Sequence, residues 1–182
     1  MQVAPTRRLH LIVPHGDGTR LLADGADLPA VDIELADGES TVAGAVRWLG
    51  EVGLPSWPVD CAIDQIDAAD LGDRRREALV VADPPPDGWV APAGWYWIAW
   101  TDVEPTVADG IAAIVDERVS EFAGTRPVPD NRADWARSGW IDPVRKWVEH
   151  ALADNGWAPI LSVTPVRLWG ISAVVRICLL YT

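Results

Sequence analysis

The last apolar run of the sequence constrains the fold of this chain most. Residues 173–181 read Ala-Val-Val-Arg-Ile-Cys-Leu-Leu-Tyr, which is the composition of a buried strand, and only Thr182 follows. Such a strand needs cover on both faces and pairing along both edges. The strand-like run at residues 160–168 supplies one edge. We therefore expect one complete small domain followed by the opening of a second. The last strand should lie at an exposed edge or pair with another copy of the chain, which predicts self-association.

Composition and charge exclude several classes of partner. The chain has 182 residues, 49% hydrophobic and 23% charged, with eleven Trp, so it can bury a core. Its net charge of −12 argues against nucleic acid or an anionic membrane as partner, because both require a basic face. No stretch approaches the ~18 continuous apolar residues of a membrane span, and the N-terminus lacks a signal-peptide pattern. We expect a cytoplasmic protein.

The two cysteines lie far apart in the sequence. Cys61 and Cys178 each sit inside an apolar, strand-like run. This placement predicts two buried free thiols and no disulfide framework.

Changes in hydrophobic period along the chain predict an α/β (α+β) fold. Short apolar or alternating runs predict strands at residues 9–13, 20–23, 31–35, 57–66, 78–82, 95–100, 160–168 and 173–181, the first two as a hairpin. Aromatic residues alternate to both faces of the strand at 95–100, so we expect both of its faces to be covered. Stripes of period 3.6 predict helices around residues 42–49, 107–122 and 140–152. Ser40 or Thr41 should cap the first helix, and Asp142 followed by Pro143 should begin the third.

A shift in composition suggests where one domain ends. Residues 125–132 are rich in Pro, Asn, Asp and Arg. We therefore expect a first domain at 1–124, a linker at 125–133 and a second, partial domain at 134–182.

The order of elements over residues 9–123 resembles the Nudix fold, a mixed sheet flanked by helices. In that family the first helix carries a Glu-rich box whose carboxylates hold Mg²⁺ on a nucleoside diphosphate, because the metal must bridge phosphates and polarise water. Aligning the family's Gly-hydrophobic ending on Gly53 and Leu54 places the box over residues 38–54. The resemblance then implies that Glu51 is a metal-binding carboxylate.

The box departs from the family pattern. Val46 and Arg47 stand where the family has Arg-Glu, and Gly50 replaces the first acid of the Glu-Glu pair. Glu51 is therefore the one retained carboxylate, and we favour its interpretation as a solvated Glu on the exposed face of an amphipathic helix. We expect a non-catalytic Nudix-like domain. The alternative is an active hydrolase of nucleoside diphosphate derivatives that combines Glu51 with Glu39 and Asp37.

The C-terminal residues carry a second resemblance. Residues 134–140, Asp-Trp-Ala-Arg-Ser-Gly-Trp, and 166–176, Val-Arg-Leu-Trp-Gly-Ile-Ser-Ala-Val-Val-Arg, resemble the entry to the kinase domain of actinobacterial aminoglycoside phosphotransferase-like proteins, some of which carry a Nudix-like region in front. This implies a helix and β-hairpin at the start of a kinase N-lobe, truncated early. Gly170, Ile171 and Ser172 would form the flap over the ATP phosphates, since backbone N–H groups in a tight turn cradle phosphate oxygens.

The kinase-like residues 134–182 do not include the residues that phosphotransfer requires. A phosphotransferase that uses ATP and Mg²⁺ needs a Lys on its third strand, a catalytic Asp and a metal-binding Asp. Lys146 is the only Lys, and it lies in the third predicted helix. We expect no cofactor and no phosphotransfer from this chain alone, with the missing kinase domain as its partner. A further alternative is a small-ligand module that uses the Trp-rich strands around Trp89, Trp95, Trp97 and Trp100.

Overall fold

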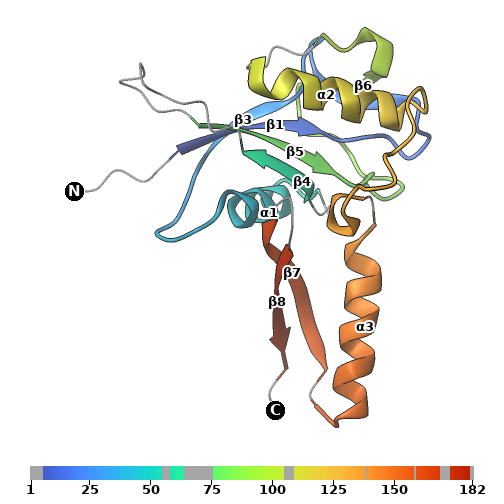
Figure 1. The fold of residues 1–182 in the computed structure, drawn as a ribbon. Coiled ribbons are helices and arrows are strands. Elements are labelled where there is room, and N and C mark those ends of the chain that lie inside the picture. Colours follow the sequence, from blue (N-terminus) through green and yellow to red (C-terminus); the bar gives the residue numbers. More distant parts are fainter. Residues whose placement is uncertain are drawn as a thin grey trace.

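The computed structural model describes residues 6–54, 58–63, 76–104, 109–137, 139–157, 159–168 and 173–180 (Figure 1). The strands are β1 (Thr6–Ile12), β2 (Arg20–Asp24), β3 (Ala30–Glu34), β4 (Pro58–Ile63), β5 (Arg76–Ala82), β6 (Trp95–Ala99), β7 (Ile160–Leu168) and β8 (Ala173–Leu179). The helices are α1 (Thr41–Glu51), α2 (Asp109–Phe122) and α3 (Ile141–Asp154), with 3₁₀ turns at Trp100–Asp102 and Asp134–Ala136. The predicted α+β class is confirmed.

A mixed four-stranded sheet forms the centre of the first 124 residues. Its order is β3-β1-β5-β4, in which β1 and β5 are parallel and the other pairs are antiparallel. Helices α1 and α2 lie on opposite faces of this sheet (Figure 1). Because both faces are covered, the central strands are continuously apolar, and Leu9, Leu11 and Val80 are fully buried.

The hairpin predicted for residues 9–23 forms only close to its turn. The His15 N–H donates to the Arg20 carbonyl at 2.9 Å, and the Leu22 N–H donates to the Val13 carbonyl at 3.0 Å. Beyond the turn, β1 enters the central sheet, while β2 pairs antiparallel with β6 in a separate two-stranded sheet. The strands separate because β1 is paired on both sides by β3 and β5.

Helix α1 begins and ends where the sequence predicts. The Ser40 Oγ accepts a hydrogen bond from the Ala43 N–H at 3.1 Å, and Gly53 follows the helix with a φ of 68°. Gly44 allows the helix to approach β3 closely. A Cβ at this position would lie 2.5 Å from Leu35 Cδ2 and 3.0 Å from Ile33 Cδ1, so a larger residue would require these side chains to shift.

The segment predicted as a linker is held against α2. The Arg132 guanidinium donates to the carboxylates of Glu117 and Glu121, and Arg118 donates to Glu121 at 3.1 Å. The side chains of Arg118, Glu121 and Arg132 are each less than a tenth exposed. These contacts anchor the segment between α2 and α3 to the first domain.

The last three elements extend away from the central sheet (Figure 1). Helix α3 begins at Ile141 with Trp140 at the N-cap position, so the predicted start at Asp142 and Pro143 is wrong by two residues. Strands β7 and β8 form an antiparallel hairpin, and β7 has the predicted bounds. The hairpin contacts the first domain through α1, where the Ser40 Oγ donates to the Val166 carbonyl.

Two predictions about individual side chains are wrong. Cys178 is an exposed free thiol, because β8 lies at the edge of a two-stranded sheet; the side chain of Cys61 lies outside the described residues. The sequence also predicts cover on both faces of β6. Tyr96 is 49% exposed, and its hydroxyl reaches out to donate to the Gly25 carbonyl at 2.8 Å.

Candidate functional site

Glu51, the residue that the Nudix resemblance implies as a metal ligand, lies on the exposed face in the last turn of α1. Its Oε1 lies 3.2 Å from Arg47 Nη1, one helical turn earlier. Arg47 also donates to Glu39 Oε1 and Oε2 at 3.2 and 3.1 Å, and to the Glu34 carbonyl at 2.7 Å. The guanidinium of Arg47 therefore lies between the two carboxylates.

This arrangement disfavours a divalent cation. The hydrogen bond from Arg47 lowers the pKa of Glu39, and the bonds to Glu39 and Glu51 raise the pKa of Arg47. Glu39 is engaged a second time, because its Oε2 accepts the Ala36 N–H at 2.9 Å. The part of the chain that the structure describes contains no group of three or more His, Cys, Asp and Glu that could hold a metal ion. The residues present do not fit the Mg²⁺ of a Nudix box, because a fixed cation already neutralises the acids.

The predicted phosphate flap, Gly170, Ile171 and Ser172, lies outside the described residues. The strands on either side of it are described, and their register pairs Leu168 with Ala173.

The Trp-rich strands contact one another and the core. The rings of Trp89 and Trp97 are 6.1 Å apart in an edge-to-face arrangement, and those of Trp48 and Trp95 are 5.9 Å apart. Trp48, Trp89, Trp95, Trp97 and Trp100 all pack, partly buried, against the core cluster. Aromatic pairs of this kind fill a core and stabilise it.

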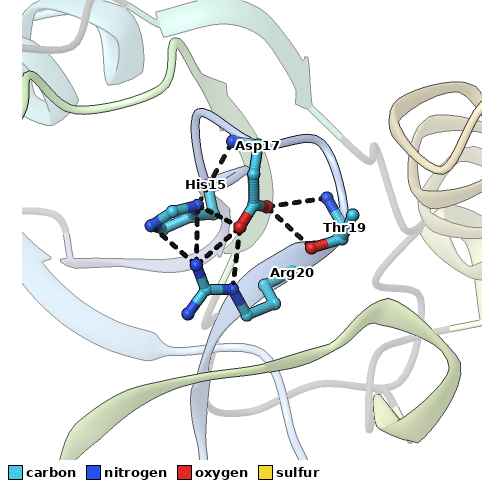
Figure 2. Close-up of polar contacts among 4 residues, drawn as sticks. All are labelled: His15, Asp17, Thr19 and Arg20. Atoms are coloured by element: carbon cyan, nitrogen blue, oxygen red, sulfur yellow. Dashed lines mark hydrogen bonds and ion pairs between the residues drawn. The ribbon is translucent and has the colours of Figure 1, made fainter.

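A polar cluster lies at the β1–β2 turn beside these aromatic rings. His15 packs edge-to-face on Trp97 with 4.9 Å between ring centroids. Figure 2 shows the side chains of His15, Asp17, Thr19 and Arg20 converging. Asp17 Oδ1 accepts the Thr19 N–H and hydroxyl at 2.9 and 2.8 Å, while Oδ2 lies 2.9 Å from His15 Nδ1 and 2.5 Å from Arg20 Nη2.

These contacts close a turn and leave no free acid. The Thr19 N–H, followed by the Arg20 guanidinium, holds the pKa of Asp17 well below its usual range. Both carboxylate oxygens are already bonded within the turn, as in an Asx turn. The cluster therefore supports the β1–β2 connection and does not offer an unengaged general base.

A cavity of about 430 Å³ lies where the start of α1 meets the hairpin. Asp37, Glu39 and Arg47 line it from the first domain, and Thr164 and Arg176 line it from β7 and β8. This is the place where the two parts of the chain bring charged groups together.

A larger and mainly apolar cavity lies between α3 and β8. It has a volume of about 830 Å³ and is lined by Asp134, Trp135, Arg137, Gly139, Trp140, Pro143, Val144, Trp147, Ala173 and Val175. The sequence reasoning missed it. The spacing of seven residues between Trp140 and Trp147 places both on one helix face, but only the packing of α3 beside β8 turns that face into a cavity wall.

No protein-family model matches the sequence, and no curated protein matches it. Within the described residues, no helix is both long enough and apolar enough to cross a membrane.

Proposed function

We propose that this chain is a non-catalytic Nudix-like accessory domain joined to the first helix and hairpin of an aminoglycoside phosphotransferase-like kinase lobe. The accessory domain holds that hairpin in place, and the chain by itself does not transfer phosphate. The partner is either the remainder of the kinase domain or a second copy of the chain. In both cases the partner is expected to dock along β8.

The observation that carries the proposal is the position of Arg47. An active Nudix box concentrates negative charge around Mg²⁺. Here the guanidinium bonds both Glu39 and Glu51, so the charge is compensated without a metal. In the aligned box Arg47 stands where the family has the Glu of its Arg-Glu pair, so the box has lost an acid and gained a cation that stabilises the helix.

The contact between α1 and the hairpin supports the accessory role. Helix α1 is the element that would carry catalysis in a Nudix enzyme, and here it packs against β7. Ser40 both caps α1 and contacts the hairpin. Its Oγ accepts a hydrogen bond from the Ala43 N–H and donates one to the Val166 carbonyl of β7. The start of α1 is thus part of a docking surface for the hairpin.

The test is an assay for turnover with Mg²⁺. We expect the wild-type chain to release no phosphate or nucleoside monophosphate from a panel of nucleoside diphosphate derivatives. It should also transfer no phosphate from ATP to aminoglycosides. Glu51→Gln is the critical variant, with Glu104→Gln, an exposed acid outside the helices, as the control. Turnover that Glu51→Gln abolishes and Glu104→Gln preserves would establish the hydrolase alternative.

Arg47→Gln sharpens the same test. If Arg47 replaces the metal, its removal leaves Glu39 and Glu51 uncompensated and creates weak affinity for Mg²⁺ or Ca²⁺. Calorimetric titration with either metal should show binding to Arg47→Gln and none to the wild-type chain. Equal binding by both proteins would mean that Arg47 does not control the site.

A further inference from the structure

Strand β8 presents an open backbone edge. It pairs with β7 alone among the described residues, and the two strands form a sheet of their own. Its seven residues contain no Pro and one charged side chain, Arg176. Val174 and Ile177 are 43% and 41% exposed, and Leu180 just beyond the strand is 42% exposed. Natural edge strands usually carry charges, Pro or a covering segment, and β8 has little of this protection.

The distribution of charge favours this edge as the place where two copies meet. Only three of the 27 Asp and Glu residues lie at positions 139–182, together with four of the 15 Lys and Arg residues. Residues 1–138 therefore account for the whole negative net charge. The hairpin extends away from that acidic region (Figure 1), so two copies that dock along β8 keep their acidic parts apart.

We propose that β8 pairs antiparallel with β8 of a second copy about a twofold axis, with Ile177 facing Ile177 of that copy. This inference rests on the docking role of β8 in the proposed function, and it names the occupant and the register. Twofold pairing uses the same surface on both copies and extends each two-stranded hairpin into one four-stranded sheet.

The residues of β8 select the register. A twofold axis must pass between two copies of the same residue. Centring the pair on Arg176 would place two guanidinium groups directly opposite, which is destabilising. Centring it on Val175 would oppose Ala173 and Ile177. Centring it on Ile177 opposes Val175 with Leu179 and two Ile177 side chains, so larger apolar pairs form.

The cavity beside β8 provides an apolar surface that an added strand can continue. Ala173 and Val175 line the 830 Å³ cavity, and the exposed Trp147 of α3 forms part of its wall. Side chains alternate across a strand, so alternate residues of the second copy point toward the same face as Val175. They extend the apolar surface that begins in the cavity.

The first experiment measures oligomeric state across a dilution series by sedimentation velocity. We expect a reversible dimer that strengthens with added salt, because salt screens the repulsion between two copies of net charge −12. Val174→Lys should weaken the dimer by about tenfold or more, since a charge on an edge strand opposes pairing. Val90→Lys, the same substitution at a loop position that is 83% exposed, is the matched control and should leave the dimer unchanged.

The second experiment measures the register. In a chain without native Cys (Cys61→Ser and Cys178→Ser), single Cys substitutions are placed at Val175, Arg176 and Ile177 and oxidised with copper phenanthroline. The Ile177 variant should cross-link fastest, since only there does a residue face its own copy. Fastest cross-linking at another of the three positions would overturn the register.

A monomer at every concentration, with circular dichroism unchanged, would overturn the dimer. A dimer that Val174→Lys does not weaken would also overturn pairing through β8. Neither result bears on Arg47 or on turnover. Failure of this inference is thereby distinguished from failure of the proposed function, which only Glu51-dependent hydrolysis or phosphate transfer overturns.

Discussion

Strands of similar apolar sequence are buried in the first domain and partly exposed in the C-terminal hairpin. In the central sheet, β1 and β5 are paired on both edges and covered by α1 and α2, so Leu11, Leu79 and Val80 are almost fully buried. In the hairpin, β8 has one partner among the described residues, and Val174 and Ile177 are more than two-fifths exposed. The apolar content of a strand thus indicates what it can bury, while the number of neighbours decides what it does bury.

The largest effect that tests this comparison comes from a matched pair of Leu substitutions. Leu79→Ala on β5 should lower the free energy of unfolding by about 2–5 kcal/mol, because it leaves a cavity in a packed core. Leu161→Ala on β7, where the side chain is 61% exposed, should change it by less than about 0.5 kcal/mol. Urea denaturation of both variants provides the measurement. Equal losses would mean that the hairpin contributes to the core as much as the sheet does.

A second prediction concerns the segment that joins the two parts. Arg132→Met leaves Glu117 and Glu121 without their shared guanidinium, at a site where Arg132 and Glu121 are less than a tenth exposed. Because Glu117 is one-third exposed, the effect should not exceed the low end of the range for a fully buried ion pair. We therefore expect the free energy of unfolding to fall by about 2–3 kcal/mol.

The control for this variant is Arg8→Met, which removes an exposed ion pair to Asp32. This variant should lower the free energy of unfolding by less than about 1 kcal/mol. If the two variants were equally stable, residues 125–133 would behave as a free linker and the packing against α2 would contribute nothing.

The smallest predicted effect is a pH dependence from the β1–β2 turn. The pKa of Asp17 is lower in the folded chain than its unfolded value of about 4, so between the two values the folded state binds fewer protons. The stabilisation is therefore present above about pH 4 and is lost as the pH falls further. Asp17→Asn should flatten the acid limb of a plot of stability against pH. Asp87→Asn, at an exposed loop position, should leave that limb unchanged.

Much of the secondary structure follows from local sequence. The stripe Val42, Ala45 and Leu49 with Ser40 in front predicts α1, because the helical period and the cap are local properties. The same holds for β7, whose observed bounds match the prediction. The start of α3 is the exception: Trp140 is buried at the N-cap position, so tertiary packing prevails over the local signal from Asp142 and Pro143.

The candidate site follows less from local sequence. Alignment on Gly53 predicts a role for Glu51, and the i, i+4 spacing to Arg47 is visible in the sequence. That Arg47 also reaches Glu39 and the Glu34 carbonyl requires α1 to fold back beside the end of β3, which no spacing rule encodes. That Trp140, Trp147 and Val175 line one cavity likewise depends on how two separate elements pack.

The sequence by itself determined the α+β class, most element positions and the departures of residues 38–54 from the Nudix box, because these depend on residue type and short spacing. Only the tertiary structure decided that β1 and β2 enter different sheets, that Arg47 lies between two acids and that Cys178 is exposed on β8. Each of these depends on long-range pairing, and the partner of a strand edge is selected by the whole fold rather than by its own residues.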